Sequence, residues 1–165
     1  MRNYLLVLFA AIISVIECSS QSTKKELHSP KKTNTNYDTF LKTGWYNISA
    51  SPNTFKRQLD KDTISFYIDP TPIITAKNIK NLNLYEYENS EIGLTMEFDK
   101  NGTLLWKYWT NKAVGGKLAF IINDILVYTP TVVSEIAWGK AALNRGIYSK
   151  AELEFFKETI DKERK

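Results

Sequence analysis

The stretch that decides the fold runs from residue 92 to residue 130 and reads IGLTMEFDKNGTLLWKYWTNKAVGGKLAFIINDILVYTP. Its first seven residues alternate between two faces, with Ile92, Leu94, Met96 and Phe98 on one and Gly93, Thr95 and Glu97 on the other. This period of two predicts a strand of an antiparallel sheet with one covered face and one partly wet face. Asp99 suits the N-cap of a following helix, which Gly115 and Gly116 would end.

The second part of this stretch predicts a hairpin. Two apolar runs, 118–122 and 125–129, flank Asn123 and Asp124. Both of these residue types tolerate positive φ, which a two-residue hairpin turn requires. Pro130 then ends the second arm because proline has no N–H to donate to a sheet.

The flanking segments complete an α+β pattern. Ser149 and Glu152 form a capping box for a last helix, and upstream residues 64–68 alternate as a strand that the prolines at 70 and 72 are expected to end. We therefore predict a ferredoxin-like α+β fold. Its antiparallel sheet would carry two main helices on one face, at about 99–113 and 149–160.

The N-terminus predicts export and lipid attachment. A basic start precedes an apolar run, residues 4–16, which is shorter than the ~20 residues of a spanning helix but fits a secretory signal peptide. Cys18 follows it, which is typical of a bacterial lipoprotein signal whose Cys becomes the lipidated first residue, although Glu17 departs from the usual small residue. Cleavage after Ser20 and an uncleaved anchor are the alternatives.

The remaining boundaries follow from composition. Residues 1–18 are the predicted signal peptide, 19–42 a flexible polar tether, 43–63 an N-terminal extension and 64–161 the folded domain.

Several chemistries are excluded by residue counts. The chain of 165 residues has one Cys and one His, and both precede the predicted domain. A Ser-His or Cys-His catalytic group and a Cys/His zinc site therefore lack members. The net charge of +4 is small for a nucleic-acid binder. Glu86/Glu88 and Glu152/Glu154 have the placement of solvated carboxylates. We predict no enzymatic activity, no cofactor, no metal and no nucleic-acid partner.

The order and spacing of these features over residues 64–160 resemble the head subdomain of the first periplasmic domain of SecDF. The residues that carry the resemblance are Leu94, Phe98, Gly102, Trp106, Thr110, Gly115, 118–124, Pro130, Ile136, 139–141, Ser149 and Glu152. The chain also looks like small lipoproteins of Bacteroidetes-type bacteria that carry this module alone. It departs from the family at Asn123-Asp124, where Asp-Gly is usual. It also has no apolar span after residue 18, so the resemblance does not extend to the membrane-embedded, proton-coupled pump of SecDF.

The resemblance implies a lipid-anchored binding module in the periplasm, on the inner or outer membrane, that contacts secreted or unfolded polypeptide or translocon proteins during export. An open edge strand of the sheet could bind such a polypeptide by strand addition. Our candidate binding residues are Tyr85, Tyr87 and Tyr128, with Cys18 as the lipid attachment site. The main alternative is a structural or interaction lipoprotein that binds one folded envelope partner and has no export role. A hydrolase or sugar-binding protein is a third hypothesis.

Overall fold

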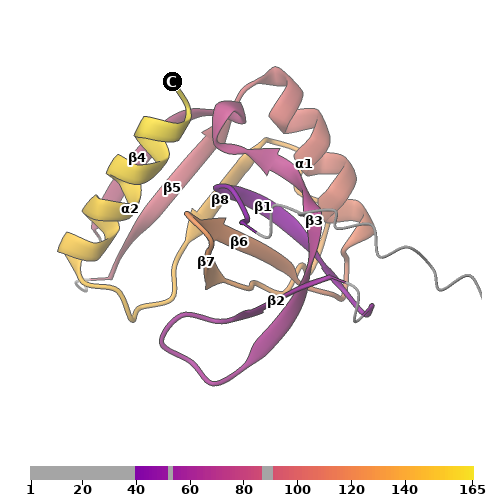
Figure 1. Ribbon diagram of the computed structural model, residues 1–165. Coiled ribbons are helices and arrows are strands. Elements are labelled where there is room, and N and C mark those ends of the chain that lie inside the picture. Colours follow the sequence, from indigo (N-terminus) through magenta and orange to yellow (C-terminus); the bar gives the residue numbers. More distant parts are fainter. Residues whose placement is uncertain (1–39, 52–53, 87–90) are drawn as a thin grey trace, which may run out of the picture. The chain divides into compact units, whose positions relative to one another are not determined.

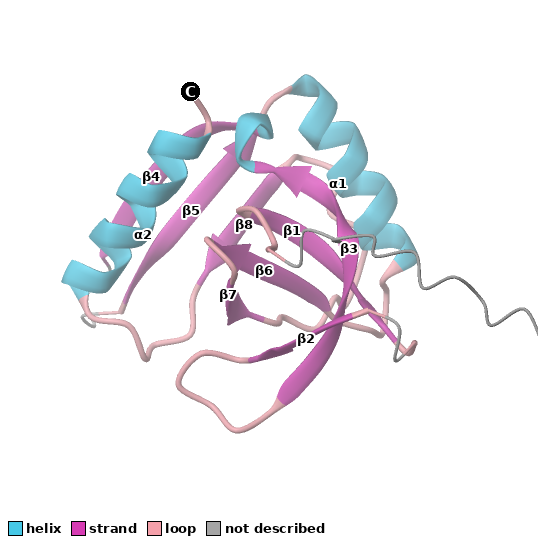
Figure 2. Cartoon of the chain, viewed as in Figure 1, coloured by secondary structure: helices cyan, strands magenta, loops and turns pink. Residues whose placement is uncertain are grey.

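The computed structural model describes residues 40–51, 54–86 and 91–165 (Figures 1 and 2). The predicted signal peptide, Cys18, nearly all of the tether and Tyr87 lie outside these residues. Within the described part, no helix has the length and apolar character needed to cross a membrane.

The larger sheet has five antiparallel strands in the order β2-β3-β1-β6-β7. Their bounds are β1 (Gly44–Ser49), β2 (Phe55–Gln58), β3 (Ser65–Thr75), β6 (Leu118–Ile122) and β7 (Ile125–Tyr128). Its outermost strands approach one another, because Leu59, just after β2, forms a parallel bridge with Leu126 of β7. The Asp60 N–H donates to the Leu126 carbonyl at 2.8 Å. The sheet is therefore curled into a partly closed barrel.

The smaller sheet has the antiparallel order β4-β5-β8, with β4 (Ile79–Glu86), β5 (Ile92–Phe98) and β8 (Lys140–Leu143). A 3₁₀ turn, η1 (Ala76–Asn78), connects β3 to β4. The helices are α1 (Lys100–Lys112) and α2 (Lys150–Glu163), which lie at opposite margins of the view in Figure 1. The predicted ferredoxin-like α+β class is confirmed, with the strands divided between two sheets.

The main core lies between the two sheets and the helices, and aromatic rings fill its centre. Trp45 of β1 stacks on Phe120 of β6 with ring centroids 4.7 Å apart and lies 4.8 Å from Trp106 of α1. The α2 side chains that reach this core are Leu153, Phe156 and Ile160. Residues 43–63, assigned above to an extension, supply β1 and β2, and β1 lies in the middle of the larger sheet.

A second core fills the inside of the curled sheet. Its buried members are Leu41, Tyr46, Leu59, Ile68, Ala119, Ile121 and Leu126. Strand β6 contributes to both cores, so all five of its residues are buried. A strand covered on both faces requires a continuous apolar run, which explains the sequence LAFII.

The predicted caps and turn are confirmed. The Asp99 carboxylate accepts from the Gly102 N–H at 2.6 Å, and Ser149 and Glu152 bond each other reciprocally. The hairpin residues Asn123 and Asp124 have φ of 49° and 71°.

The expectation that the prolines end β3 is wrong, because that strand continues through Pro70 and Pro72. Strand β2 pairs only with residues 65–68 of β3. The register with β1 shifts on either side of the pair Tyr46–Pro72. Prolines are tolerated at such unpaired and irregular positions.

Candidate functional site

The three candidate tyrosines do not form one site in the described structure. Tyr85 is half-buried on β4, and Tyr128 is half-buried on β7 in the other sheet. The Tyr128 ring packs toward the main core, 6.4 Å from Trp45, and burial raises the pKa of its phenol. Tyr87 lies outside the described residues. Both β4 and β7 are outermost strands of their sheets, but of the two described candidates only Tyr128 packs against the main core.

Tyr85 is held by a close contact across the sheet. It pairs in register with Gly93 of β5, and a Cβ atom added at Gly93 would lie 2.5 Å from the Tyr85 hydroxyl oxygen. The aromatic ring therefore occupies the space above a glycine in the neighbouring strand. Such packing covers the glycine backbone, so that Gly93 is buried, and it fixes the ring on the outer face of the smaller sheet.

Strand β4 forms one edge of the smaller sheet, and side chains at the start of α2 and just after its end contact the two ends of this strand. Near the start of the strand, Arg164 donates to the Lys80 carbonyl at 3.1 Å. Near its end, the Lys150 ammonium lies 3.3 Å from a Glu86 carboxylate oxygen. Residues 81–84 lie between these two contacts, and within the described part of the chain no strand pairs with them on their outer side. An edge strand of this kind presents unpaired backbone groups.

The outer face of the smaller sheet is hollowed next to this edge. A pocket of about 460 Å³ is lined by Asn83, Thr95, Met96, Glu97, Ile136, Lys140, Ala141 and Ala142. Thr95 and Ala142 face each other in register on β5 and β8. The lining combines small side chains with longer polar and apolar ones on an open sheet face, which suits the side chains of a docked peptide more than a deeply buried small ligand.

The lining of this pocket carries one pair of opposite charges. Glu97 and Lys140 are opposite each other in register. The Asn81 amide donates to Glu97 at 3.0 Å. This hydrogen bond, with the positive charges of Lys80 and Lys140, holds the pKa of the Glu97 carboxyl below its usual value. The pocket lining therefore carries an ionised Glu97 beside Lys140.

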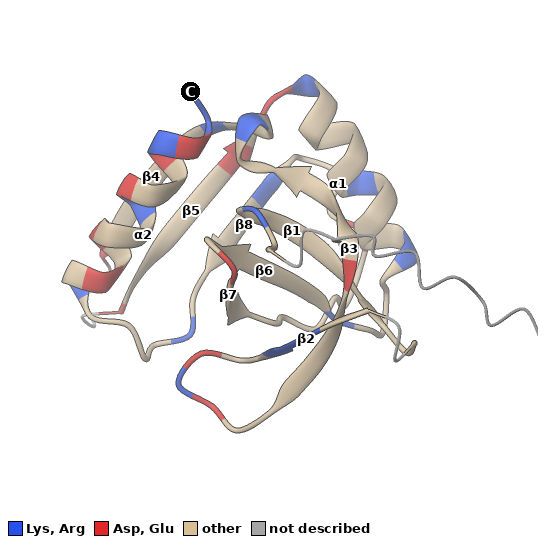
Figure 3. Cartoon of the chain, in the orientation of Figure 1, with Lys and Arg blue, Asp and Glu red and all other residues tan. Residues whose placement is uncertain are grey.

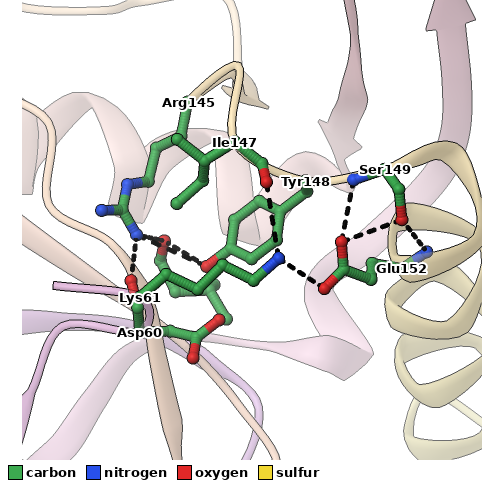
Figure 4. A network of polar contacts seen from close by, with 8 residues as sticks. Asp60, Lys61, Arg145, Ile147, Tyr148, Ser149 and Glu152 are labelled. Atoms are coloured by element: carbon green, nitrogen blue, oxygen red, sulfur yellow. Dashed lines mark hydrogen bonds and ion pairs between the residues drawn. The ribbon is translucent and has the colours of Figure 1, made fainter.

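A separate polar network joins the loop after β2 to the start of α2 (Figure 4). The Lys61 ammonium bonds a Glu152 oxygen at 2.5 Å and lies 5.0 Å from the centre of the Tyr148 ring. Arg145 donates to the Asp60 carbonyl at 2.7 Å. This network has a structural role, since it fixes the N-terminus of α2 against the larger sheet.

Two pKa values in this network are shifted. The Lys61 hydrogen bond, together with bonds from Ser149, lowers the pKa of Glu152 to about 2. Burial and the nearby Asp60 carboxylate raise the pKa of the Tyr148 phenol above its ordinary value. Its hydroxyl group donates to the Val127 carbonyl at 3.2 Å. The network therefore combines an ionised acid with a neutral phenol at neutral pH.

Sequence patterns identify part of this site. The alternation over residues 92–98 places Thr95 and Glu97 on the partly wet face, as the structure does. The short strand β8 and its contribution to the pocket have no comparable signal, because KAAL has no period-two contrast. Among residues 40–51, 54–86 and 91–165, no group of three or more His, Cys, Asp or Glu side chains could hold a metal ion.

Comparison with known proteins identifies the family. The model of the family described as SecDF, P1 head subdomain, matches residues 52–154, more than half of the chain. The chain belongs to the SecDF P1 head subdomain family. The predicted resemblance is thereby confirmed. The segment matched to the P1 head subdomain begins after β1 and ends within α2. No curated protein matches the chain.

Solved structures of SecDF share the fold. The chain matches "Crystal structure of SecDF in Super-membrane-facing form" with a TM-score of 0.52 and 16% identity, over 57% of this chain and 12% of that one. It matches "Structure and function of a membrane component SecDF that enhances protein export" with a TM-score of 0.53 and 16% identity, over 57% of this chain and 42% of that one. The P1 head module thus spans less than half of either SecDF chain.

Proposed function

We propose that the protein is a non-enzymatic binding module of the bacterial envelope that contacts extended secreted polypeptide in the periplasm during export. In this proposal, lipid on Cys18 tethers the domain to the inner or outer membrane. Family membership supports the link to export, because one solved SecDF is described as a membrane component that enhances protein export. The observation that carries the proposal is the open edge of β4.

The edge of β4 fits a polypeptide in extended conformation. Four residues, 81–84, lie between the contacts of Arg164 and Lys150, and no strand of the described residues pairs with them on their outer side. A strand that adds to this edge would form main-chain hydrogen bonds, which are independent of the sequence added. Secreted chains differ in sequence, so backbone pairing is a suitable mode of recognition for them.

The neighbouring pocket would then receive side chains of the added strand. Asn83 belongs to both β4 and the pocket lining, so the edge and the pocket are continuous. Alternate side chains of an added strand point to the same face of the sheet. Small apolar or hydroxyl side chains would fit over Thr95 and Ala142, beside the paired charges of Glu97 and Lys140.

Photo-crosslinking in the living source cell tests this proposal. A benzophenone amino acid is placed at Asn83 or Tyr85, next to the β4 edge, and as matched controls at Ile125 and Phe155, which are exposed elsewhere. We expect adducts with many secreted chains at the two β4 positions and few at the controls. Equal yields at all four positions, or no protein adduct at β4, would overturn the proposal.

A second candidate function has an observation in its favour. Val133 and Trp138 are 84% and 72% exposed, more than any other large apolar side chain of the described residues. Such side chains are typical of a surface that another molecule covers. An interaction lipoprotein with one folded envelope partner would use them. The crosslinking experiment distinguishes this candidate, because it would trap one discrete folded protein rather than many secreted chains.

A further inference from the structure

The solvent-facing side of α1 combines lysines with large apolar groups. Lys100, Leu104, Lys107, Tyr108 and Lys112 recur at helical spacing and are all exposed. The exposed fractions of Leu104 and Tyr108 are 62% and 53%. These residues form one continuous outer face of the helix.

The charge on this helix has a single sign. Helix α1 contains three lysines and no acidic residue, whereas α2 contains three lysines and five acidic residues. Figure 3 shows the same contrast between the two helices. The apolar outer face of α1 is therefore set in a positive field that α2 lacks.

The segment 132–139 runs beside α1 and enlarges this face. At the C-terminal end of the helix, the Val132 N–H donates to the Gly116 carbonyl at 2.9 Å. In the middle, the Ile136 N–H donates to the Thr110 hydroxyl oxygen at 3.0 Å. The segment is thus held along α1 by hydrogen bonds that its backbone N–H groups donate.

Trp138 extends the face near the start of the helix. The next residue, Gly139, lies against α1, since a Cβ atom added there would lie 2.8 Å from the Thr103 Cβ. Val133, at the other end of the segment, is also exposed. We define the basic apolar face as Lys100, Leu104, Lys107, Tyr108, Lys112, Val133 and Trp138.

One acidic side chain lies within this surface, and it is neutralised. Glu135 lies 3.6 Å from the Lys107 ammonium and accepts from the Asn111 amide at 3.1 Å. The ammonium groups of Lys100 and Lys112 remain to attract an anionic partner, and Lys112 also lies 5.5 Å from the centre of the Tyr108 ring. Lys112 and Tyr108 together therefore present both apolar surface, from the ring and the lysine stem, and a positive charge.

We propose that the basic apolar face rests on a membrane that contains anionic phospholipid. Trp and Tyr concentrate at membrane–water interfaces, where their amphipathic rings lie at headgroup depth. Surface-bound helices pair such apolar groups with lysines that attract anionic headgroups. A folded protein partner fits less well, because lysine is depleted in protein–protein interfaces. Nucleic acid fits less well, because its binding is dominated by contacts to phosphate charges, which leave Leu104 and Val133 without a role.

This orientation goes beyond the proposed binding function and does not depend on it. Helix α1 and the β4 edge beside α2 lie at opposite margins of the domain (Figure 1). A domain resting on α1 would therefore hold the β4 edge away from the lipid. Failure of strand addition at β4 would leave the membrane contact unaffected, and failure of the membrane contact would leave strand addition unaffected.

Quenching of tryptophan fluorescence by brominated lipid tests the proposal on the full chain. Trp138 is exposed, whereas Trp45 and Trp106 are only 1% and 3% exposed. The chain is bound to vesicles of phosphatidylethanolamine and brominated phosphatidylglycerol, with brominated phosphatidylcholine vesicles as the uncharged comparison. We expect stronger quenching of the wild type than of Trp138→Phe, and this difference should be larger on the anionic vesicles.

Two matched triple variants test the role of charge. Lys100→Gln/Lys107→Gln/Lys112→Gln should lose most of the Trp138-dependent quenching, since each lysine near an anionic surface contributes roughly a factor of five in affinity. Lys150→Gln/Lys157→Gln/Lys162→Gln, on α2, should keep it. Near-ultraviolet circular dichroism without vesicles confirms that each variant is folded.

Two results would overturn the proposal. The first is equal quenching of wild type and Trp138→Phe on anionic vesicles, which is also what a surface reserved for a protein partner would give. The second is Trp138-dependent quenching that neither lipid charge nor the α1 lysines change.

Discussion

The Thr43 hydroxyl group donates a hydrogen bond of 2.5 Å to the carboxylate of Glu163, although the two residues are 120 positions apart. Thr43 is 1% exposed, just before β1, and Glu163 is the last residue of α2. The same hydroxyl oxygen accepts from the Asn123 N–H at 3.1 Å. One threonine thus joins the larger sheet, its hairpin turn and the C-terminal end of α2.

Replacement of Thr43 by valine keeps the shape and removes these bonds. A buried hydrogen bond to a charged group contributes about 1.5–3 kcal/mol, so we expect Thr43→Val to lower the free energy of unfolding by about 2 kcal/mol. Urea denaturation measures this change. The control is Thr63→Val, at an exposed position, which should have little effect. Equal midpoints for the two variants would contradict the prediction.

The two buried tryptophans of the main core should respond differently to the same substitution. The Trp106 indole N–H donates to the Lys140 carbonyl at 3.1 Å. The buried Trp45 indole N–H has no hydrogen-bond partner in the described part of the chain. Both changes to phenylalanine remove similar ring volume, but Trp106→Phe also leaves the Lys140 carbonyl without this donor. We expect Trp106→Phe to lower the free energy of unfolding by about 1 kcal/mol more than Trp45→Phe in chemical denaturation. The opposite order would show that packing, and not the hydrogen bond, decides the difference.

Gly93 should not tolerate even a methyl group. A Cβ atom there would lie 2.5 Å from the Tyr85 hydroxyl oxygen and 2.6 Å from the Leu143 carbonyl oxygen. We expect Gly93→Ala to lower the free energy of unfolding by about 1–3 kcal/mol, as overpacking does. Thermal or urea denaturation measures it, and Gly116→Ala, whose Cβ would be 3.3 Å from its nearest neighbour, is the milder control.

A double variant separates the two clashes at Gly93. Tyr85→Ala removes the ring but leaves the backbone carbonyl of Leu143 in place. The cost of adding Gly93→Ala should therefore be smaller in the Tyr85→Ala background than in the wild type, but not zero. An unchanged cost would show that the ring does not contact Gly93 in solution.

The Glu152 carboxylate should make stability depend on pH in the acidic range. Its pKa is about 2 in the folded chain, below the ordinary value of 4.5. A lowered folded pKa stabilises the fold above the unfolded pKa, and this contribution is lost as pH falls from about 5 toward 2. The variant Glu152→Gln should lack this part of the pH dependence. Because Lys61 is the first cause of the shift, Lys61→Gln should raise the pKa partway toward 4.5. Urea denaturation at a series of pH values measures the first effect, and NMR titration of the Glu152 carboxyl carbon in wild type and Lys61→Gln measures the second. A wild-type midpoint near 4.5 would contradict both.

The elements that sequence patterns predict well are those whose signals are local. The caps at Asp99 and Ser149 and the turn at Asn123-Asp124 depend on backbone groups within three residues, and all three are confirmed. The course of β3 through Pro70 and Pro72 could not be predicted in this way. It depends on where β2 stops pairing and where the register with β1 shifts, which are properties of neighbouring strands.

The helix α1 shows the same limit at the level of side chains. Its pattern suggests a stripe of Leu105, Trp109 and Ala113, but the fully buried line is Gly102, Trp106 and Thr110, with that stripe partly buried beside it. Thr110 can be buried there because its hydroxyl group donates to the Trp106 carbonyl and accepts from the Ile136 N–H, so the polar group is not left without partners. The candidate pocket was likewise not predictable, since β8 reaches it from 40 or more residues beyond β5.

The position of β1 has a consequence for how the chain folds. This strand precedes the other strands in sequence, yet its partners are residues 67–75 and residues 118–121. Non-local pairing of this kind slows folding, because distant segments must meet before their contacts contribute stability. With α2 also bonded to Thr43, no contiguous half of the described chain contains a complete set of sheet neighbours. We therefore expect the two cores to form together in one cooperative step, late in synthesis, rather than one after the other.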